Sequence, residues 1–207
     1  MKAKLLRVLF LAVFAAAFTA AGYVIAQQKA SAEMRPQVRR VVTKLDDSGK
    51  AVVMIDEHTP LVAPRPPNYA ANVWVTSTNL PDFTNVADRG KTRIGLVPPK
   101  GGTVFRIVDF APDSQGEHPT DMNHMMKIVG AEAPKRGLPP RHPMMHRTRS
   151  LDYGIVMSGE IDMLMDEGEV HLKAGDVFVQ QATNHAWVNR GQAPARVAFI
   201  LIDSQEP

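Results

Sequence analysis

The sequence predicts a small all-β barrel, and three observations indicate it. Short runs rich in β-branched residues alternate with turn residues, at the spacing typical of a sandwich or barrel. No segment after Met34 has the apolar period of a long amphipathic helix. From residue 144 onward the runs follow one another through short connections, which join antiparallel neighbours.

Composition is that of a globular protein and excludes several functions. The chain has 207 residues, of which 44% are hydrophobic and 22% charged. It contains no cysteine, so disulfides, thiolate metal ligands and cysteine nucleophiles are excluded. The formal net charge is only +3, and no Lys/Arg run with interleaved aromatics occurs. Nucleic acid is therefore not an expected partner.

Residues 1–32 have the layout of a secretory signal peptide. Lys2, Lys4 and Arg7 precede an uncharged, mostly apolar run over residues 8–26, and small-residue cleavage patterns end at Ala26 and Ala32. We expect an exported protein, periplasmic or secreted. The alternative is an uncleaved membrane anchor through residues 8–26, with the barrel outside the cytoplasm.

Residues 33–112 are expected to form an N-terminal extension of strands. Runs at 38–43 and 51–55 flank the turn 46–49 and predict a hairpin. Further strands are expected at 72–76, 93–97 and 103–109.

Residues 113–143 differ because they are rich in proline, which central strands exclude. We interpret this segment as a loop or lid across the barrel mouth, and a plain surface insertion is the alternative. A short helix is expected over 121–129.

Residues 144–207 are expected to be the barrel core, in one domain with 33–143. Their turns contain glycines at 159, 168, 175 and 191. The expected strands are 144–149, 152–157, 160–165, 169–173, 177–180, 185–188 and 196–202.

Three side chains in this core can share the barrel interior. Alternation places His146 and Thr148 on one face, Asp152 and Gly154 on one face of the next strand, and His185 and Trp187 on one face of a later strand. Two imidazoles and a carboxylate are what an iron-, manganese- or zinc-type metal site needs. A buried aspartate also requires a partner, and a metal or a histidine supplies one.

A substrate pocket is expected beside this site. Gly154 leaves open space next to the carboxylate, Thr148 offers an oxygen for water or substrate, and Trp187 offers a ring for stacking. The alternative for Trp187 is a core packing role. Methionines and histidines near 122–126 and 142–146 leave copper(I) handling open as a further alternative.

Residues 152–160 and 175–189 resemble the two conserved motifs of the cupin superfamily. The chain is most similar to small single-domain conserved-barrel (cupin type 2) proteins of an uncharacterised bacterial subgroup. This resemblance implies a double-stranded β-helix, or jelly-roll, barrel. The first motif has the form His-x-His, three or four residues, Glu, six residues, Gly, and here Thr148 stands for its second histidine and Asp152 for its glutamate.

The resemblance implies metal ligands at three of four positions, His146, Asp152 and His185. The second motif departs from the family, because Gln181-Ala182 replaces the usual Pro-x-Gly before His185. The implied cofactor is a divalent ion: Fe²⁺, Mn²⁺, Ni²⁺ or Zn²⁺.

Three functions follow from these residues and the resemblance. The first is a metal-dependent enzyme acting on a small organic molecule, of dioxygenase, decarboxylase or isomerase type. The second is a non-catalytic small-molecule-binding cupin with a degenerate metal site. The third is structural, and in it the strands of 38–55 complete a partner's sheet in a homodimer.

Overall fold

The computed structural model describes residues 36–65, 67–78, 80–83, 87–115, 130 and 141–205. The chain divides into two compact units, Met1–Pro36 and Gln37–Pro207, and the fold below is that of the second unit. The predicted signal or anchor segment, the helix over 121–129 and most of the Pro-rich loop lie outside the described residues. Within the described part of the chain, no helix has both the length and the apolar character needed to cross a bilayer.

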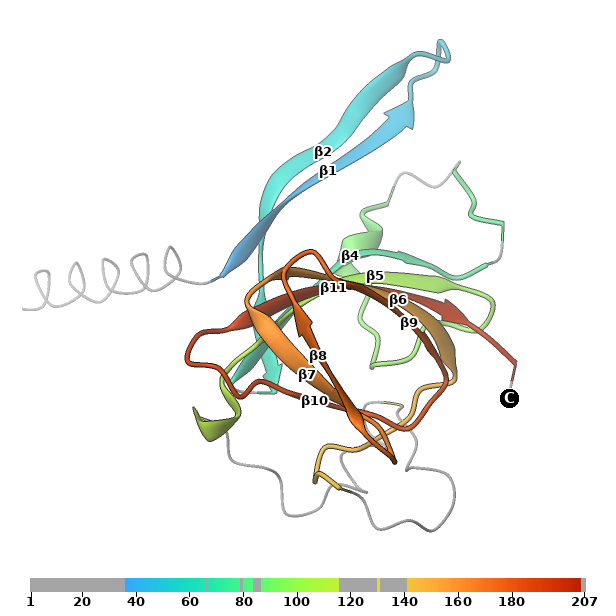
Figure 1. The fold of residues 1–207 in the computed structure, drawn as a ribbon. Coiled ribbons are helices and arrows are strands. Elements are labelled where there is room, and N and C mark those ends of the chain that lie inside the picture. Colours follow the sequence, from blue (N-terminus) through green and yellow to red (C-terminus); the bar gives the residue numbers. More distant parts are fainter. Residues whose placement is uncertain are drawn as a thin grey trace, which may run out of the picture. The chain divides into compact units, whose positions relative to one another are not determined.

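The described residues are mostly strands, which confirms the all-β prediction (Figure 1). Two short 3₁₀ helices, η1 (Arg89–Lys91) and η2 (Asp113–Gln115), lie between them. The strands are β1 (Gln37–Leu45), β2 (Ala51–Pro60), β3 (Val62–Arg65), β4 (Asn68–Thr76), β5 (Thr103–Phe110), β6 (Ser150–Ser158), β7 (Glu160–Leu164), β8 (Glu169–Lys173), β9 (Val177–Gln181), β10 (Ala186–Val188) and β11 (Ala195–Asp203).

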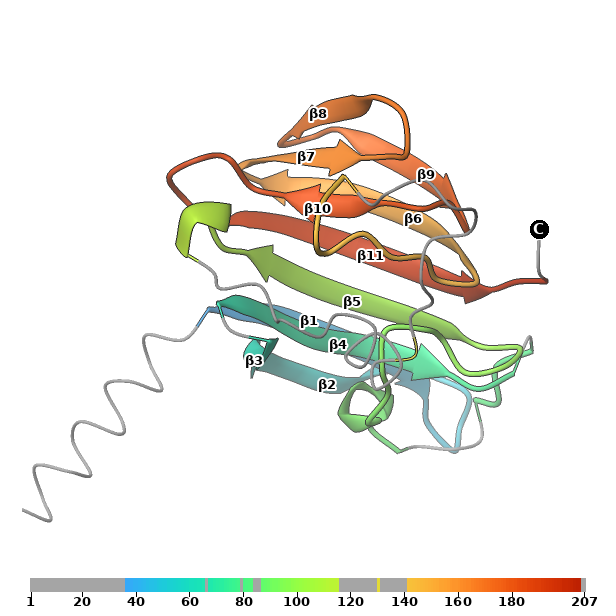
Figure 2. The same cartoon turned by 90° about the horizontal axis from the view of Figure 1, so that it is seen from below.

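The strands form three antiparallel sheets. A six-stranded sheet has the order β3-β4-β5-β11-β6-β9, and a three-stranded sheet has the order β10-β7-β8. Figure 2 shows the three-stranded sheet stacked over one face of the β11-β6-β9 part of the larger sheet. The third sheet is the β1–β2 hairpin, which was predicted around its turn at Gly49.

The core lies between the two larger sheets. Alternation along each strand sends one set of side chains into it, as with Val104 on β5, Val156 on β6 and Val197 on β11, each at most 1% exposed. Chain reversals at Gly159, Gly168 and Gly175 have positive φ, which glycine adopts without a Cβ clash. These turns lie where the sequence predicts them.

The root of the β1–β2 hairpin contacts the outer face of the six-stranded sheet. Val38 packs on a second apolar cluster that includes Leu61 and Ile107. Arg40 is buried and bonds both oxygens of Asp88, near η1, at 2.7 and 2.8 Å. Beyond this root the hairpin leaves apolar side chains exposed.

Two predicted strands are wrong. Residues 93–97 are irregular, because their region gives its carbonyls to side chains: Asn72 donates to Thr92 and Arg106 to Gly95. Residues 144–149 contain isolated bridges at His146 and Arg147 and no strand before Ser150. There Pro143 precedes, and the imidazole of His142 accepts the Met144 N–H, so a regular ladder does not form.

Candidate functional site

The backbone itself brings His146 and His185 together. They form an antiparallel bridge in which each N–H donates to the other's carbonyl at 2.9 Å. Their ring centroids are 4.4 Å apart, with an interplanar angle of 53°. His185 immediately precedes β10, so this bridge continues the three-stranded sheet beyond β10. The two imidazoles that the sequence predicts to converge therefore do so.

Both rings are oriented in the same way by a backbone carbonyl. His146 Nδ1 lies 2.8 Å from the Met144 oxygen, and His185 Nδ1 lies 2.9 Å from the Thr183 oxygen. A carbonyl only accepts, so each Nδ1 carries the hydrogen, and in the neutral ring the lone pair resides on Nε2. Burial, and secondarily the neighbouring His146, lower the pKa of His185 to about 3. His185 is thus a neutral nitrogen donor at physiological pH.

Asp152 lies in a separate polar cluster on β6. It is buried, its Oδ2 accepts from Gln180 Nε2 at 3.3 Å, and its Oδ1 makes no hydrogen bond. Burial raises the pKa of Asp152 to about 6, opposed by the hydroxyls of Ser150 and Thr148 and by the charge of Arg106. Desolvation exceeds these favourable contacts, so the ionised carboxylate is held at a cost.

The predicted three-ligand convergence is not seen. Among the described residues, no group of three or more His, Cys, Asp or Glu side chains is placed to hold a metal ion. The two imidazoles fit a metal in tautomer, since a carbonyl that orients the second ring nitrogen is typical of histidine ligands, and His185 is also neutral. Asp152 is not grouped with them, and its Oδ2 accepts a hydrogen bond from Gln180 on the neighbouring β9.

The predicted substrate-pocket residues have mixed outcomes. Thr148 is buried and accepts a hydrogen bond from Ser150 at 3.0 Å, within the Asp152 cluster. Gly154 does not leave open space, because a Cβ there would overlap the Phe178 ring, which fills that volume. Trp187 lies 4.8 Å from Phe178, centroid to centroid, and packs on the core. Its position matches the packing alternative.

Sequence reasoning missed Arg106 and Gln180. Arg106 is 9% exposed on β5 and donates to Asn72 and Gly95. Gln180 is 2% exposed, and its Oε1 makes no hydrogen bond. The sequence could have indicated both residues. Arg106 is two residues from Val104, and Gln180 is two residues from Phe178, so each shares the inward face of its strand.

Comparison with known proteins identifies the class. Residues 131–202 match the family model of the cupin domain. The phomopsin biosynthesis cluster protein D of Diaporthe leptostromiformis is 34% identical over 189 residues, covering 86% of this chain and 85% of that protein. A cupin-domain-containing oxidoreductase, srdD, of Neurospora crassa is 30% identical, covering 82% and 77%. The chain therefore belongs to the cupin superfamily, and its all-β architecture is a cupin barrel.

Two further likenesses are narrower or weaker. The cupin-domain-containing oxidoreductase virC of Hypocrea virens is 46% identical, covering 49% of this chain and 41% of that protein. A cupin 2 conserved barrel protein of Salinispora arenicola is 16% identical with a TM-score of 0.37, covering 70% and 82%. The curated relatives named here are fungal, so they do not support the expected bacterial subgroup.

Proposed function

We propose that this chain is a cupin enzyme acting on a small organic molecule, with the His146–His185 pair as its metal-binding centre. One observation carries the proposal. Each ring has its Nδ1 beside a backbone carbonyl, and the two ring centroids are 4.4 Å apart, so the Nε2 atom of each ring is the one suited to bind a metal. Paired donors of this kind suit Fe²⁺, Mn²⁺, Ni²⁺ or Zn²⁺.

In this proposal the residues around the centre have different roles. A divalent ion held by the two Nε2 atoms would supply Lewis-acid polarisation of a substrate oxygen. The Thr183 and Met144 carbonyls fix the orientation of the rings. The Asp152 cluster, with Thr148, contributes polar lining instead of a third ligand, and the Phe178 and Trp187 rings contribute an apolar wall.

Relatives support an oxidative reaction on a secondary metabolite. Four of the matching proteins are named cupin-domain-containing oxidoreductases, and two are named as proteins of a phomopsin biosynthesis cluster. We propose the same broad class for this chain, an oxidoreductase of small-molecule metabolism. Decarboxylation or isomerisation at the same centre would be the other outcomes of an activity assay.

Metal content tests the proposal directly. We expect stoichiometric metal in the purified protein by elemental analysis, and its loss in the His146→Ala, His185→Ala double variant. The control is His58→Ala, since that imidazole is exposed and lies on the β1–β2 hairpin, away from the pair. Equal metal in the double variant and the wild type would refute the pair as the centre.

A non-catalytic binder is the second candidate. The observation that favours it is the pair of buried acceptors without donors, Asp152 Oδ1 and Gln180 Oε1, which is unusual in a folded interior. Protein that carries no metal, yet is stabilised against heat by a metabolite extract, would support the binder over the enzyme.

We also propose that the chain forms a homodimer. A strip of apolar side chains on the outer face of β6 and β9 is 42–71% exposed: Tyr153, Ile155, Val177 and Val179, with Met157 beside them. The β1–β2 hairpin exposes Val41, Leu45 and Val53. Large exposed apolar patches mark interaction sites. Light scattering should give twice the chain mass for the wild type and one chain mass for Ile155→Lys with Val179→Lys.

Export is proposed on residues 1–32 alone. A cationic start and an apolar run predict translocation to the periplasm or the medium, with a membrane anchor through 8–26 as the other outcome. Intact-mass measurement of the protein from its native host decides between them. A mature start near residue 27 or 33 indicates cleavage, and a full-length chain in the membrane fraction indicates anchoring.

A further inference from the structure

The turn between β7 and β8, residues 165–168, contacts both segments that carry the histidines. It is closed by the Met165 N–H, which donates to the Gly168 carbonyl at 3.2 Å. Gly168 has a φ of 74°, so the turn has a fixed left-handed corner. The turn bonds Arg141, which lies shortly before His146 in the chain, and Asn184, which directly precedes His185.

Arg141 provides the connection to the His146 segment. Its guanidinium Nη1 donates to the carbonyls of Met165, at 3.1 Å, and of Gly168. Its backbone N–H contacts the sulfur of Met145 at 3.3 Å. Met145 is 4% exposed and packs in a cluster with Leu164 and Ala186 on the two neighbouring strands. Because Met145 directly precedes His146, these contacts hold the backbone on the N-terminal side of that histidine.

Asn184 provides the connection to the His185 segment. Its side-chain N–H donates to Asp166 Oδ2 at 2.7 Å, and the next residue is His185. The same four-residue turn therefore holds one segment through its carbonyls and the other through a carboxylate. Neither connection involves the imidazoles, so each can change without removing a ligand atom.

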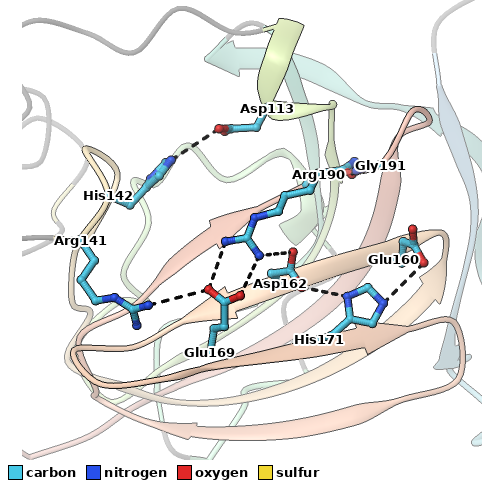
Figure 3. Close-up of polar contacts among 10 residues, drawn as sticks. Asp113, Arg141, His142, Glu160, Asp162, Glu169, His171, Arg190 and Gly191 are labelled. Carbon is cyan, nitrogen blue, oxygen red and sulfur yellow. Dashed lines mark hydrogen bonds and ion pairs between the residues drawn. The ribbon is translucent and has the colours of Figure 1, made fainter.

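An ion-pair network on β7 and β8 supports this turn (Figure 3). Glu169, the first residue of β8, pairs with Arg190 at 2.9 Å and with Arg141 at 3.8 Å. Arg190 also pairs with Asp162 at 2.8 Å, and Asp162 bonds His171 at 2.8 Å. Arg141 thus lies at the end of a network that spans both strands.

We propose that the 165–168 turn is a positioning element that sets the spacing of His146 and His185, with Arg141, Asp166 and Asn184 as its positioning residues. The metal readout of this inference rests on the proposed function above. Groups that orient metal ligands typically change affinity about 10- to 100-fold when removed. A shift of either segment would move its Nε2 donor relative to the other.

The test measures Zn²⁺ affinity by calorimetry and backbone amide exchange in the metal-free protein. Asp166→Ala should weaken zinc binding by about tenfold and speed exchange of the His146 and His185 amides, both of which donate across the bridge. Glu167→Ala is the matched control, because Glu167 lies exposed in the same turn. The swap of Asp166→Asn with Asn184→Asp should restore both readouts, which a general loss of stability would not allow.

The possible outcomes separate the two proposals. Asp166→Ala and Glu167→Ala behaving alike in both measurements would overturn the positioning role. Zinc binding that survives in the His146→Ala, His185→Ala double variant would overturn the metal centre instead. In that case the amide exchange alone decides the positioning role.

Discussion

The His146–His185 bridge and the Asp152 cluster belong to one barrel, yet their responses to pH are opposite. Burial lowers the pKa of His185 to about 3 and raises the pKa of Asp152 to about 6. The imidazole is therefore neutral and ready to donate a lone pair. The carboxylate is an anion whose Oδ1 lacks a donor. The difference teaches that burial can act in opposite directions on residues predicted to be one ligand set: it keeps the His185 imidazole neutral and makes the Asp152 carboxylate costly to ionise.

The largest expected effect is a loss of stability at acid pH caused by the buried His185. The folded pKa is about 3 and the ordinary value is 6.5, so only the unfolded chain gains a proton between them. His185 then removes on the order of 5 kcal/mol of unfolding free energy as pH falls from 6.5 to 3, and nothing above 6.5. His185→Asn, whose amide can still donate to Thr183, should lack this loss.

Urea denaturation at pH 7.5 and pH 4.5 measures this loss of unfolding free energy in the wild type and in the His185→Asn variant. The decisive quantity is how much more the wild type loses than the variant between the two pH values. Equal losses would mean that His185 is solvated or protonated in the folded protein.

Asp152 gives the next largest effect, with the opposite sign. Its folded pKa of about 6 exceeds 3.8, so the folded state holds a proton that the unfolded state has lost. Stability therefore falls as pH rises from 4 to 6, by about 3 kcal/mol, and stays lower above pH 6. Asp152→Asn should be more stable than the wild type at pH 7.5 and not at pH 4.

The same denaturation series, repeated with Zn²⁺, sharpens the comparison. A metal bound to Asp152 would lower its pKa and abolish the fall in stability. We expect the fall to persist with zinc present.

Packing around Gly154 gives a smaller effect. A Cβ at this position would overlap the Phe178 ring, so Gly154→Ala must displace it, at about 1–3 kcal/mol. Thermal unfolding checks this, and Phe178→Leu in the same chain should recover part of the loss. Additive losses in the double variant would show that the ring is not the obstacle.

The Thr148 hydroxyl gives the smallest effect. Its hydrogen bond opposes the rise in the pKa of Asp152, so Thr148→Val should raise that pKa further. A carbon-13 titration of the Asp152 carboxyl measures the shift. Thr183→Val, at an exposed position, is the control and should leave the titration where it is.

Alternation of apolar and polar residues predicts most of the strands, because the pattern that decides which face is buried lies within the sequence of each strand. β6 buries alternate residues as its sequence indicates, whereas β5 and β11 also bury Ile107 and Ala198 on the opposite face, under the second apolar cluster. Residues 93–97 look like a strand, but the Gly95 carbonyl and the neighbouring Thr92 carbonyl accept hydrogen bonds from side chains of β5 and β4. β3 was not expected because it contains Pro64. Such competition involves distant residues, which no local pattern contains.

The site was predictable in part for the same reason. The meeting of His146 and His185 follows from motif spacing and inward parity. Their tautomers depend on the carbonyls of Met144 and Thr183, and the volume beside Gly154 depends on Phe178. These are tertiary contacts, and spacing carries no information on them.

Nitrogen NMR of the two imidazoles during zinc addition tests the central claim most directly. We predict that both rings are Nδ1-protonated before zinc, that both Nε2 resonances shift together at one equivalent, and that the Asp152 titration is unchanged. Rings protonated on Nε2, or a metal-induced fall in the pKa of Asp152 without an Nε2 shift, would contradict it.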